Sequence, residues 1–314
     1  LGMSGPMAFF ALIAWLKKRG ISDVLIQKAF RQLDIASAMG EGRKLYYANK
    51  DVYRLLRYGV KDKEGAGELN QTVWLIDWHH PEANDFAIAE EVYIKGENKK
   101  RPDIVLYING IALGVLELKR SLVDVSEGIR QNLDNQKKDF IRNFFSTIQL
   151  VMAGNDTQGL RYGMIETPEK YYLEWKEELN HVEGHKLDYH LGRMCNKQRF
   201  LQIIHDFIVF DAGVKKTCRH NQFFGIEAAK QRIAKREGGI IWHTQGSGKS
   251  LTMVWLAKWI RENVSDSRVL IVTDRTELDE QIEKVFTGVE EEIYRTKSGV
   301  DLVATLNQPT PWLM

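Results

Sequence analysis

The chain has 314 residues, a length typical of about two domains, and 44% of them are hydrophobic, which is enough for ordinary buried cores. The formal net charge is +2, so net charge alone does not indicate a nucleic-acid-binding protein, and any DNA contact must come from local patches. Cys195 and Cys218 are far apart and lack metal-ligand spacing. This pattern argues against a disulfide framework or a zinc site and favours a reducing cytoplasm.

The N-terminal region is predicted to be helical. Its apolar run, residues 7–16, is too short to span a bilayer, and its basic residues follow the run instead of preceding it, unlike those of a signal peptide. A buried core helix that stops at Gly20 fits this pattern better. Residues 7–38 are therefore expected to form two helices that are separated at Arg19-Gly20.

The residue pattern of positions 72–119 predicts β-strands. Short apolar or alternating runs occur at residues 72–78, 86–94, 103–108 and 111–119. Asn109-Gly110 lies between the last two runs and predicts a hairpin. A helix is expected at residues 124–145, followed by strands at 146–154 and 160–165.

The C-terminal part has a different organisation. A helix-rich stretch at residues 169–235 leads to predicted strands at 238–243 and 268–274, which alternate with helices at 250–260 and 277–286. This β-α-β-α order predicts a parallel sheet covered by helices. We expect a domain boundary between residues 180 and 215, and assign residues 1–185 to a first domain and 186–314 to linker helices and a second, truncated domain.

A catalytic motif is predicted in the first domain. Pro102-Asp103, followed by Glu117-Leu118-Lys119, matches the PD-(D/E)xK nuclease pattern. Residues two apart on a strand share a face, so Glu117 and Lys119 point the same way, and Asp103 can reach them from the partner strand. The two carboxylates and the Leu118 carbonyl would bind Mg²⁺, which would polarise a phosphodiester and lower the pKa of a bound water. Lys119 would orient that water or stabilise developing negative charge.

The helix after this motif offers further candidates. Some nucleases of this class carry Q-x-x-x-Y there, to orient the lysine and bind DNA. Gln131 with Asn135, and Gln136 with Phe140, have the spacing but lack the tyrosine. Gln131 is the preferred candidate, and a solvated helix face is the alternative.

The sequence does not assign a role to two other groups of charged residues. Lys137, Lys138 and Arg142 form a short basic run that would contact phosphates or face solvent. Glu90 and Glu91 are candidates for a further acid, although the pattern does not favour either.

A phosphate-binding loop is predicted in the second domain. Residues 243–250 match the GxxxxGK[ST] template at Gly248, Lys249 and Ser250, with His243 in place of the first glycine. Lys249 would reach the β- and γ-phosphates of ATP, and Ser250 would hold Mg²⁺. The remaining loop positions expected around the phosphates are Thr244, Gly246, Ser247 and Gly248.

The flanks of this loop resemble superfamily 2 helicases and translocases. Residues 242–250 are similar to their first ATPase motif, and residues 268–282 to the next, whose Asp274-Arg275 could equally be a helix cap. In residues 219–229, Gln222 resembles the adenine-reading glutamine. The Asp-Glu pair of a Walker B motif is absent from a strand, since Asp279-Glu280 lies in a predicted helix. We therefore expect an incomplete motor lobe.

A nuclease followed by a motor resembles the restriction (R) subunit of type I restriction-modification enzymes over roughly residues 70–305. The resemblance implies an α/β fold, in which a PD-(D/E)xK mixed-sheet domain precedes an incomplete RecA-like parallel-sheet lobe. It implies Mg²⁺-dependent cleavage of double-stranded DNA coupled to ATP-driven translocation. It also implies modification and specificity subunits as partners, in a bacterial or archaeal cytoplasm.

Two alternative functions are also compatible with these motifs. One is another nuclease-motor fusion, such as a type III restriction subunit or a repair nuclease, although in type III enzymes the motor comes first. The other is an ATP-gated DNA-binding scaffold with an inert nuclease fold. The presence of all three motif residues argues against an inert fold.

Overall fold

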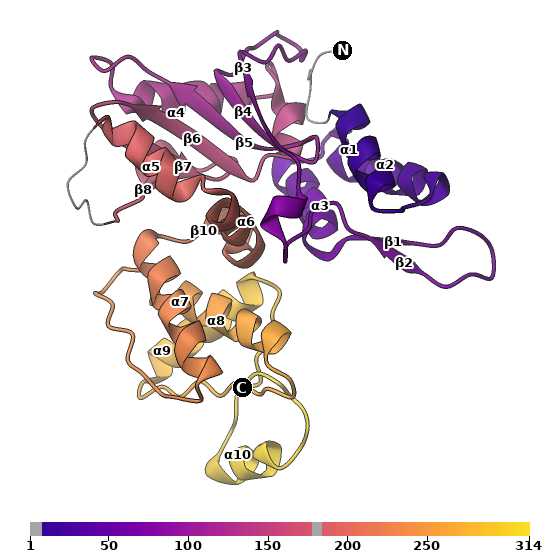
Figure 1. The fold of residues 1–314 in the computed structure, drawn as a ribbon. Coiled ribbons are helices and arrows are strands. Elements are labelled where there is room, and N and C mark those ends of the chain that lie inside the picture. The colour runs from indigo at the N-terminus through magenta and orange to yellow at the C-terminus, as the bar shows by residue number, and fades with distance from the viewer. Residues whose placement is uncertain (1–7, 178–183) are drawn as a thin grey trace. The chain divides into compact units, whose positions relative to one another are not determined.

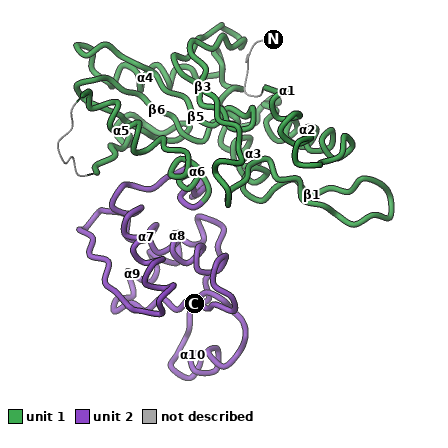
Figure 2. The backbone as a smooth tube through the Cα atoms, in the orientation of Figure 1, with its two compact units in different colours: residues 1–205 green, residues 206–314 purple. Residues whose placement is uncertain are grey.

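The computed structural model describes residues 8–177 and 184–314. The chain divides into two compact units, residues 1–205 and 206–314 (Figure 2). The division lies inside the interval 180–215, while the functional assignment of residues 1–185 and 186–314 stays a prediction. In the described residues, no helix has both the length and the apolar character needed to cross a membrane.

Unit 1 begins with the helices α1 (Phe9–Lys18), α2 (Asp23–Ser37) and α3 (Leu45–Tyr58). The predicted break at Arg19-Gly20 is confirmed, because Gly20 has φ 77° and α2 starts again after Ser22, whose hydroxyl accepts a hydrogen bond from the Leu25 amide. The apolar run forms α1 as predicted, but only one face of this helix packs into the core. It buries Leu12, Trp15 and Leu16.

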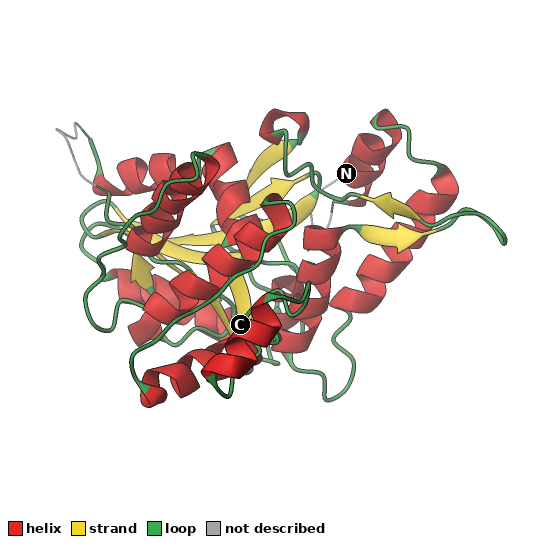
Figure 3. Ribbon diagram, turned by 90° about the horizontal axis from the view of Figure 1, so that it is seen from below, coloured by secondary structure: helices red, strands yellow, loops and turns green. Residues whose placement is uncertain are grey.

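A six-stranded mixed sheet forms the centre of unit 1 (Figure 1 and Figure 3). Its strand order is β3-β4-β5-β6-β7-β8, and only β5 and β6 are parallel. Helix α4 (Val125–Asn135) connects these two strands and packs on them. This confirms the expected mixed sheet. The strands are β3 (Phe86–Glu90), β4 (Ile104–Ile108), β5 (Ile111–Leu118), β6 (Leu150–Asn155), β7 (Gly159–Gly163) and β8 (Leu173–Glu174).

The β4–β5 hairpin sets the position of the motif residues. Its turn, Asn109-Gly110, has φ values of 51° and 80°, as a two-residue hairpin turn requires, so this prediction is confirmed. The pairing is interrupted by a β-bulge, because Tyr107 pairs with Ala112 but Leu106 pairs with Gly114. Leu113 is therefore an extra residue on β5.

Two predicted elements of unit 1 are shorter than expected. Strand 72–78 is reduced to β2 (Gln71–Val73), which pairs with β1 (Val60–Asp62), because the Asp77 carboxylate accepts hydrogen bonds from the amides of residues 79 and 80 and turns the chain. Helix 124–145 ends at Asn135, where turns lead to the 3₁₀ helix η2 (Arg142–Ser146).

The predicted helix-rich stretch contains more than helices. Unit 1 closes with α5 (Lys186–Met194) and α6 (Lys197–Asp206). Two further 3₁₀ turns lie earlier in the unit, η1 (Pro81–Ala83) and η3 (Glu169–Tyr171). Strand β8 and, in unit 2, the antiparallel hairpin of β9 (Ile208–Asp211) and β10 (Val214–Thr217) also fall within residues 169–235, contrary to the helical expectation.

Unit 2 is built mainly of helices: α7 (His220–Ala234), α8 (Lys249–Asn263), α9 (Thr276–Gly288) and α10 (Gly299–Leu306). Helices α8 and α9 confirm the predictions for 250–260 and 277–286. The ring of Phe207 packs at 5.0 Å from Phe223 and 5.9 Å from Trp255, measured between centroids. These aromatic contacts join the start of the unit to α7 and α8.

The predicted strands of unit 2 are wrong as assigned, because residues 238–243 and 268–274 form no strand in the described structure. Ile240 and Trp242 are 90% and 89% exposed, and only Val269 makes a parallel bridge, to Leu313. An apolar segment becomes a strand only when a neighbouring strand satisfies its backbone groups. Residues 269–271 pair with residues 312–314 through this bridge and three backbone hydrogen bonds, but no longer ladder forms, so the predicted parallel sheet is not formed among the described residues.

Candidate active site and phosphate loop

The acidic residues of the predicted motif meet at one end of the β4–β5 pair. Asp103 directly precedes β4, and Glu117 is the penultimate residue of β5. Ile104 pairs with Leu116, so the continued register sets Asp103 beside Glu117. Without the extra residue in β5, Asp103 would lie beside Leu116 instead. The bulge therefore aligns the two carboxylates.

Glu117 is completely buried and is held by amides. Its Oε2 accepts a hydrogen bond of 2.6 Å from Gln131 Nε2, and Asn135 Nδ2 lies 3.5 Å from its Oε1. Both amides project from α4, four residues apart and therefore on one face of the helix. The partner carboxylate, Asp103, accepts a 2.7 Å hydrogen bond from the backbone amide of Leu118.

Gln131 links the acid to the lysine of the motif. Its Oε1 accepts a 2.6 Å hydrogen bond from Lys119 Nζ while its Nε2 donates to Glu117. The other candidate, Gln136, lies away from this cluster, since its amide donates to the Asn132 carbonyl and its Oε1 accepts from the backbone amide of residue 166. The structure thus brings Gln131 to the motif residues and leaves Gln136 outside.

Burial and the neighbouring acid raise the pKa of Glu117 to about 8. Desolvation is the largest cause, followed by the charge of Asp103 and a hydrogen bond with it, while the positive charges of Lys119 and Lys100 act in the opposite direction. Lys100 was not predicted as a site residue. The available signal was the run Lys99-Lys100-Arg101, directly before Pro102-Asp103.

The donor set fits a divalent cation of hard character. Two adjacent carboxylates, one of them buried among amides, leave negative charge that a cation such as Mg²⁺ would neutralise. The described residues offer no group of three or more His, Cys, Asp or Glu side chains placed to hold a metal. Glu91 instead pairs with Arg101 at 3.3 Å. Backbone carbonyls and water would have to complete the coordination.

The phosphate loop leads directly into α8. Gly246 and Gly248 have φ values of 76° and 87°, a region that glycine adopts readily, and Gly248 is the residue before the helix. Ser247 is buried and donates its hydroxyl hydrogen to the Thr244 carbonyl at 2.7 Å. The loop therefore ends at a helix N-terminus, a favourable environment for phosphate groups.

The predicted nucleotide-binding side chains lie around this loop. Lys249 Nζ donates to the carbonyls of His243 and Thr244, at 3.3 and 3.1 Å, and the next residue, Ser250, follows it on the first turn of α8. Gln222 is 2% exposed, and both the nitrogen and the oxygen of its carboxamide are hydrogen-bonded to the backbone. It donates to the Gly248 carbonyl at 2.9 Å and accepts from the residue 219 amide at 2.8 Å. Its role in reading adenine stays a prediction.

Comparison with known families identifies the first unit. Residues 12–170 match the family model described as type I restriction enzyme R protein N terminus. The chain belongs to this family of R proteins. Residues 221–314 of this R protein match a second model, described as SWI2/SNF2 ATPase. The resemblance to type I restriction subunits is therefore confirmed, and the second match agrees with a nucleotide-binding unit.

Curated relatives of this R protein are endonuclease subunits. The chain is 28% identical over 282 residues to the type I restriction enzyme HindI endonuclease subunit of Haemophilus influenzae, an alignment that covers 82% of the chain and 27% of the relative. It is 27% identical over 222 residues to the SsaAORF53P endonuclease subunit of Staphylococcus saprophyticus, covering 67% and 23%. The chain thus spans about a quarter of the length of these relatives.

Proposed function

We propose that this chain carries the DNA-cleaving site and the start of the ATP-driven motor of a type I restriction R subunit. In this proposal, Mg²⁺-dependent cleavage of double-stranded DNA is coupled to translocation driven by ATP. The observation that carries it is the contact cluster of Asp103, Glu117, Lys119 and Gln131 at the end of the β4–β5 hairpin. The family membership and the names of the relatives support it.

The residues of the cluster would divide the work of phosphodiester hydrolysis. Asp103 and Glu117 would hold Mg²⁺ together with the Leu118 carbonyl. A cation bound there supplies Lewis-acid polarisation of the phosphodiester and acidifies water. Lys119 would orient the attacking water or stabilise negative charge on the phosphate, while Gln131 would fix the orientations of both Lys119 and Glu117.

The two units would have separate chemistry. Residues 1–185 would form the PD-(D/E)xK nuclease domain, and residues 186–314 would form linker helices and the beginning of a RecA-like lobe. In that lobe, Lys249 would contact the β- and γ-phosphates of ATP, Ser250 would hold its Mg²⁺, and Gln222 would contact the adenine. The loop glycines and the backbone amide groups from Thr244 to Gly248 would surround the phosphates.

The proposed partners follow from the family. A type I complex contains modification (methyltransferase) and specificity subunits, so we propose that this chain acts with both, on DNA, in a bacterial or archaeal cytoplasm. An inert nuclease fold is the competing proposal. The contacts among Asp103, Glu117, Lys119 and Gln131 favour an active site, because an inert fold has no need to bury the carboxyl group of Glu117 next to a second acid.

Substitution of the motif residues in the assembled enzyme tests the proposal. Asp103→Ala, Glu117→Ala and Lys119→Ala should each abolish cleavage of supercoiled plasmid, because each removes a metal ligand or the essential cation. ATP hydrolysis should persist, since the phosphate loop is in the other unit. Glu64→Ala serves as the control and should cut normally, because Glu64 is exposed and lies outside the cluster. Wild-type cutting by the Asp103 variant would overturn the site assignment.

A further inference from the structure

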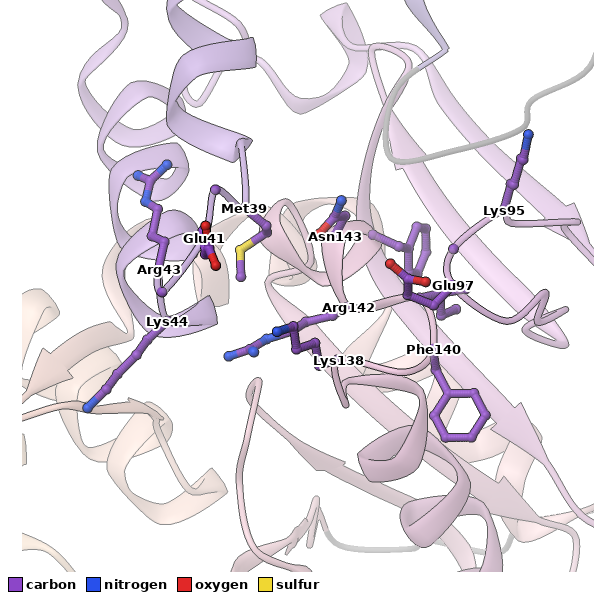
Figure 4. A pocket seen from close by; sticks show the side chains of 15 residues that line it. Met39, Glu41, Arg43, Lys44, Lys95, Glu97, Lys138, Phe140, Arg142 and Asn143 are labelled. Atoms are coloured by element: carbon purple, nitrogen blue, oxygen red, sulfur yellow. The ribbon is translucent and has the colours of Figure 1, made fainter.

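A pocket of about 830 Å³ opens on unit 1 and is lined by none of the proposed nuclease or ATP-binding residues (Figure 4). Three segments line it. They are residues 39–44 between α2 and α3, residues 95–97 before β4, and residues 138 and 140–144 after α4. The second segment leads along the chain to Asp103, and the third follows the helix that carries Gln131. Two walls of the pocket are thus continuous with the elements of the candidate nuclease site.

These walls are fixed by backbone contacts. The Glu97 amide donates to the Phe140 carbonyl at 3.2 Å, and Asn98 Nδ2 donates to the Asp139 carbonyl at 2.7 Å. Gly96 lies so close to residue 140 that a Cβ there would clash with the Phe140 carbonyl oxygen. The third wall is anchored by Arg43, which donates to two backbone carbonyls of the α2 end and pairs with Asp51. These hydrogen bonds therefore hold the three lining segments in place, and the shape of the pocket is set by the fold.

Positive charge predominates in the lining. It contains five basic side chains (Arg43, Lys44, Lys95, Lys138 and Arg142) against two carboxylates (Glu41 and Glu97). Within the described part of the chain, no carboxylate lies within ion-pair distance of the exposed Lys44, Lys95 and Lys138. Arg142, in contrast, forms a long ion pair with Glu166, in which the nitrogen and oxygen atoms are 3.6 Å apart. Figure 4 shows Lys44 and Lys95 on opposite sides of the pocket, with Arg142 and Lys138 between them.

We propose that this pocket binds the phosphodiester backbone of double-stranded DNA and holds the duplex beside the nuclease site. The inference rests on the proposed function, and adds a DNA-binding surface to it. The cations are spread across three segments and do not converge on one point. They therefore suit the regularly spaced phosphates of a DNA strand better than a single small polyanion. Lysine side chains at exposed positions contact phosphates without reading bases, so the pocket contributes affinity and no sequence preference.

Salt dependence measures such contacts directly. Each lysine that neutralises a phosphate releases condensed counterions, and contributes about 0.9 to the slope of log affinity against log salt concentration. Removing Lys44, Lys95 and Lys138 should therefore reduce the slope by about 2 to 3, and weaken binding on the order of 100-fold near 0.1 M salt.

The test uses the full R-subunit chain, a fluorescent duplex of random sequence, and EDTA without ATP, so that the DNA stays intact. Anisotropy titrations at several salt concentrations compare the wild type with K44A/K95A/K138A. The matched control is K18A/K61A/K63A, which removes the same charge from three exposed lysines elsewhere on unit 1. Thermal melting verifies that both variants are folded. A parallel calorimetric titration with tripolyphosphate tests a compact anion.

The expected result is a smaller salt slope for the pocket variant only, with weak tripolyphosphate binding that is the same in all three proteins. Equal slopes for the pocket and control variants would overturn the inference. So would tight tripolyphosphate binding that only the pocket variant loses. Neither result bears on the proposed function, which is tested separately by plasmid cleavage with the Asp103 variant.

Discussion

At the residue scale, the distinctive feature is an acid buried without a cation. Glu117 contacts amide groups and a second carboxyl group, and no ion pair to it is found among the described residues. Burial of a charged group is costly unless an opposite charge compensates it. In the metal-free protein, the neutral form of Glu117 is therefore favoured, and a bound cation has to compete with a proton.

This arrangement predicts a pH-dependent stability of the metal-free chain. The folded pKa of Glu117, about 8, is above its ordinary value of 4.5, so its contribution is complete below pH 4.5 and is lost as the pH rises through 8. Glu117→Gln should raise Tm at pH 9 by at least about 4 °C, and should have no effect near pH 4. Differential scanning calorimetry in EDTA measures this.

The exposed acid Glu64 provides the control, and Glu64→Gln should leave Tm unchanged at both pH values. Added Mg²⁺ should stabilise the wild type at pH 9 more than the Glu117 variant, because the ion replaces the proton. Identical melting of wild type and Glu117→Gln at pH 9 would contradict the assigned protonation.

The side chains of the site could be predicted only in part. Asp103, Glu117 and Lys119 follow from a sequence motif and the two-residue period of a strand. The choice between Gln131 and Gln136 could not be made from sequence, since both lie in the same polar segment. It depends on where α4 ends and which helix face meets the sheet, and these are set by packing.

At the element scale, the hairpin turn is also a docking point. The amide of Ala8 donates to the Gly110 carbonyl at 2.6 Å, so the start of α1 rests on the turn between β4 and β5. A Cβ at Gly110 would be 2.6 Å from the Ala8 oxygen. The turn that fixes the register of the site strands therefore also anchors the first helix.

Gly110→Ala should accordingly destabilise unit 1 more than a glycine substitution with the same backbone strain. Gly67 is the matched control, because its φ of 89° resembles the 80° of Gly110 but a Cβ there would meet nothing within 4 Å. We expect Gly67→Ala to cost about 1 kcal/mol and Gly110→Ala about 2–4 kcal/mol. Chemical denaturation compares them, and equal losses would mean that the contact with Ala8 contributes nothing.

The strands of the two units differ in how well sequence predicts them. In unit 1, apolar runs separated by turn residues locate the strands, because their neighbours are close in the chain. In unit 2, residues 238–243 and 268–274 also contain apolar runs, yet Trp242 and Val272 are 89% and 80% exposed. Hydrophobicity indicates a tendency to be buried, but a strand also requires a partner. The sequence of the segment itself does not contain that information.

At the scale of the whole molecule, the proposed nuclease site and the proposed ATP-binding loop lie in two different units of one chain. Among the residues that the structure describes, Lys249 Nζ is hydrogen-bonded only to two backbone carbonyls of its own loop, at 3.1 Å or more, so its removal should cost little stability. In the full-length protein, Lys249→Ala should abolish DNA cleavage, because the proposed mechanism makes cleavage depend on ATP-driven translocation.

Mg²⁺ binding and thermal melting distinguish this coupling from a folding defect. Both should be unchanged in the Lys249 variant, while plasmid cleavage in the assembled enzyme is lost. Full cleavage by the variant without ATP would show that the nuclease works independently of the motor. The motor-gated mechanism would then have to be abandoned.

The extra residue in β5 restricts where this hairpin can gain or lose residues. Surface loops of this chain can gain or lose residues at small entropic cost. Between Asp103 and Glu117, however, the loss of a single residue would remove the bulge or shift the strand, and the partner of Asp103 would become a leucine that faces the opposite side of the sheet. A single-residue deletion within β4 or β5 should therefore separate the two acids, whereas an insertion at the Asn109-Gly110 turn, which lies outside the paired residues, should leave them aligned.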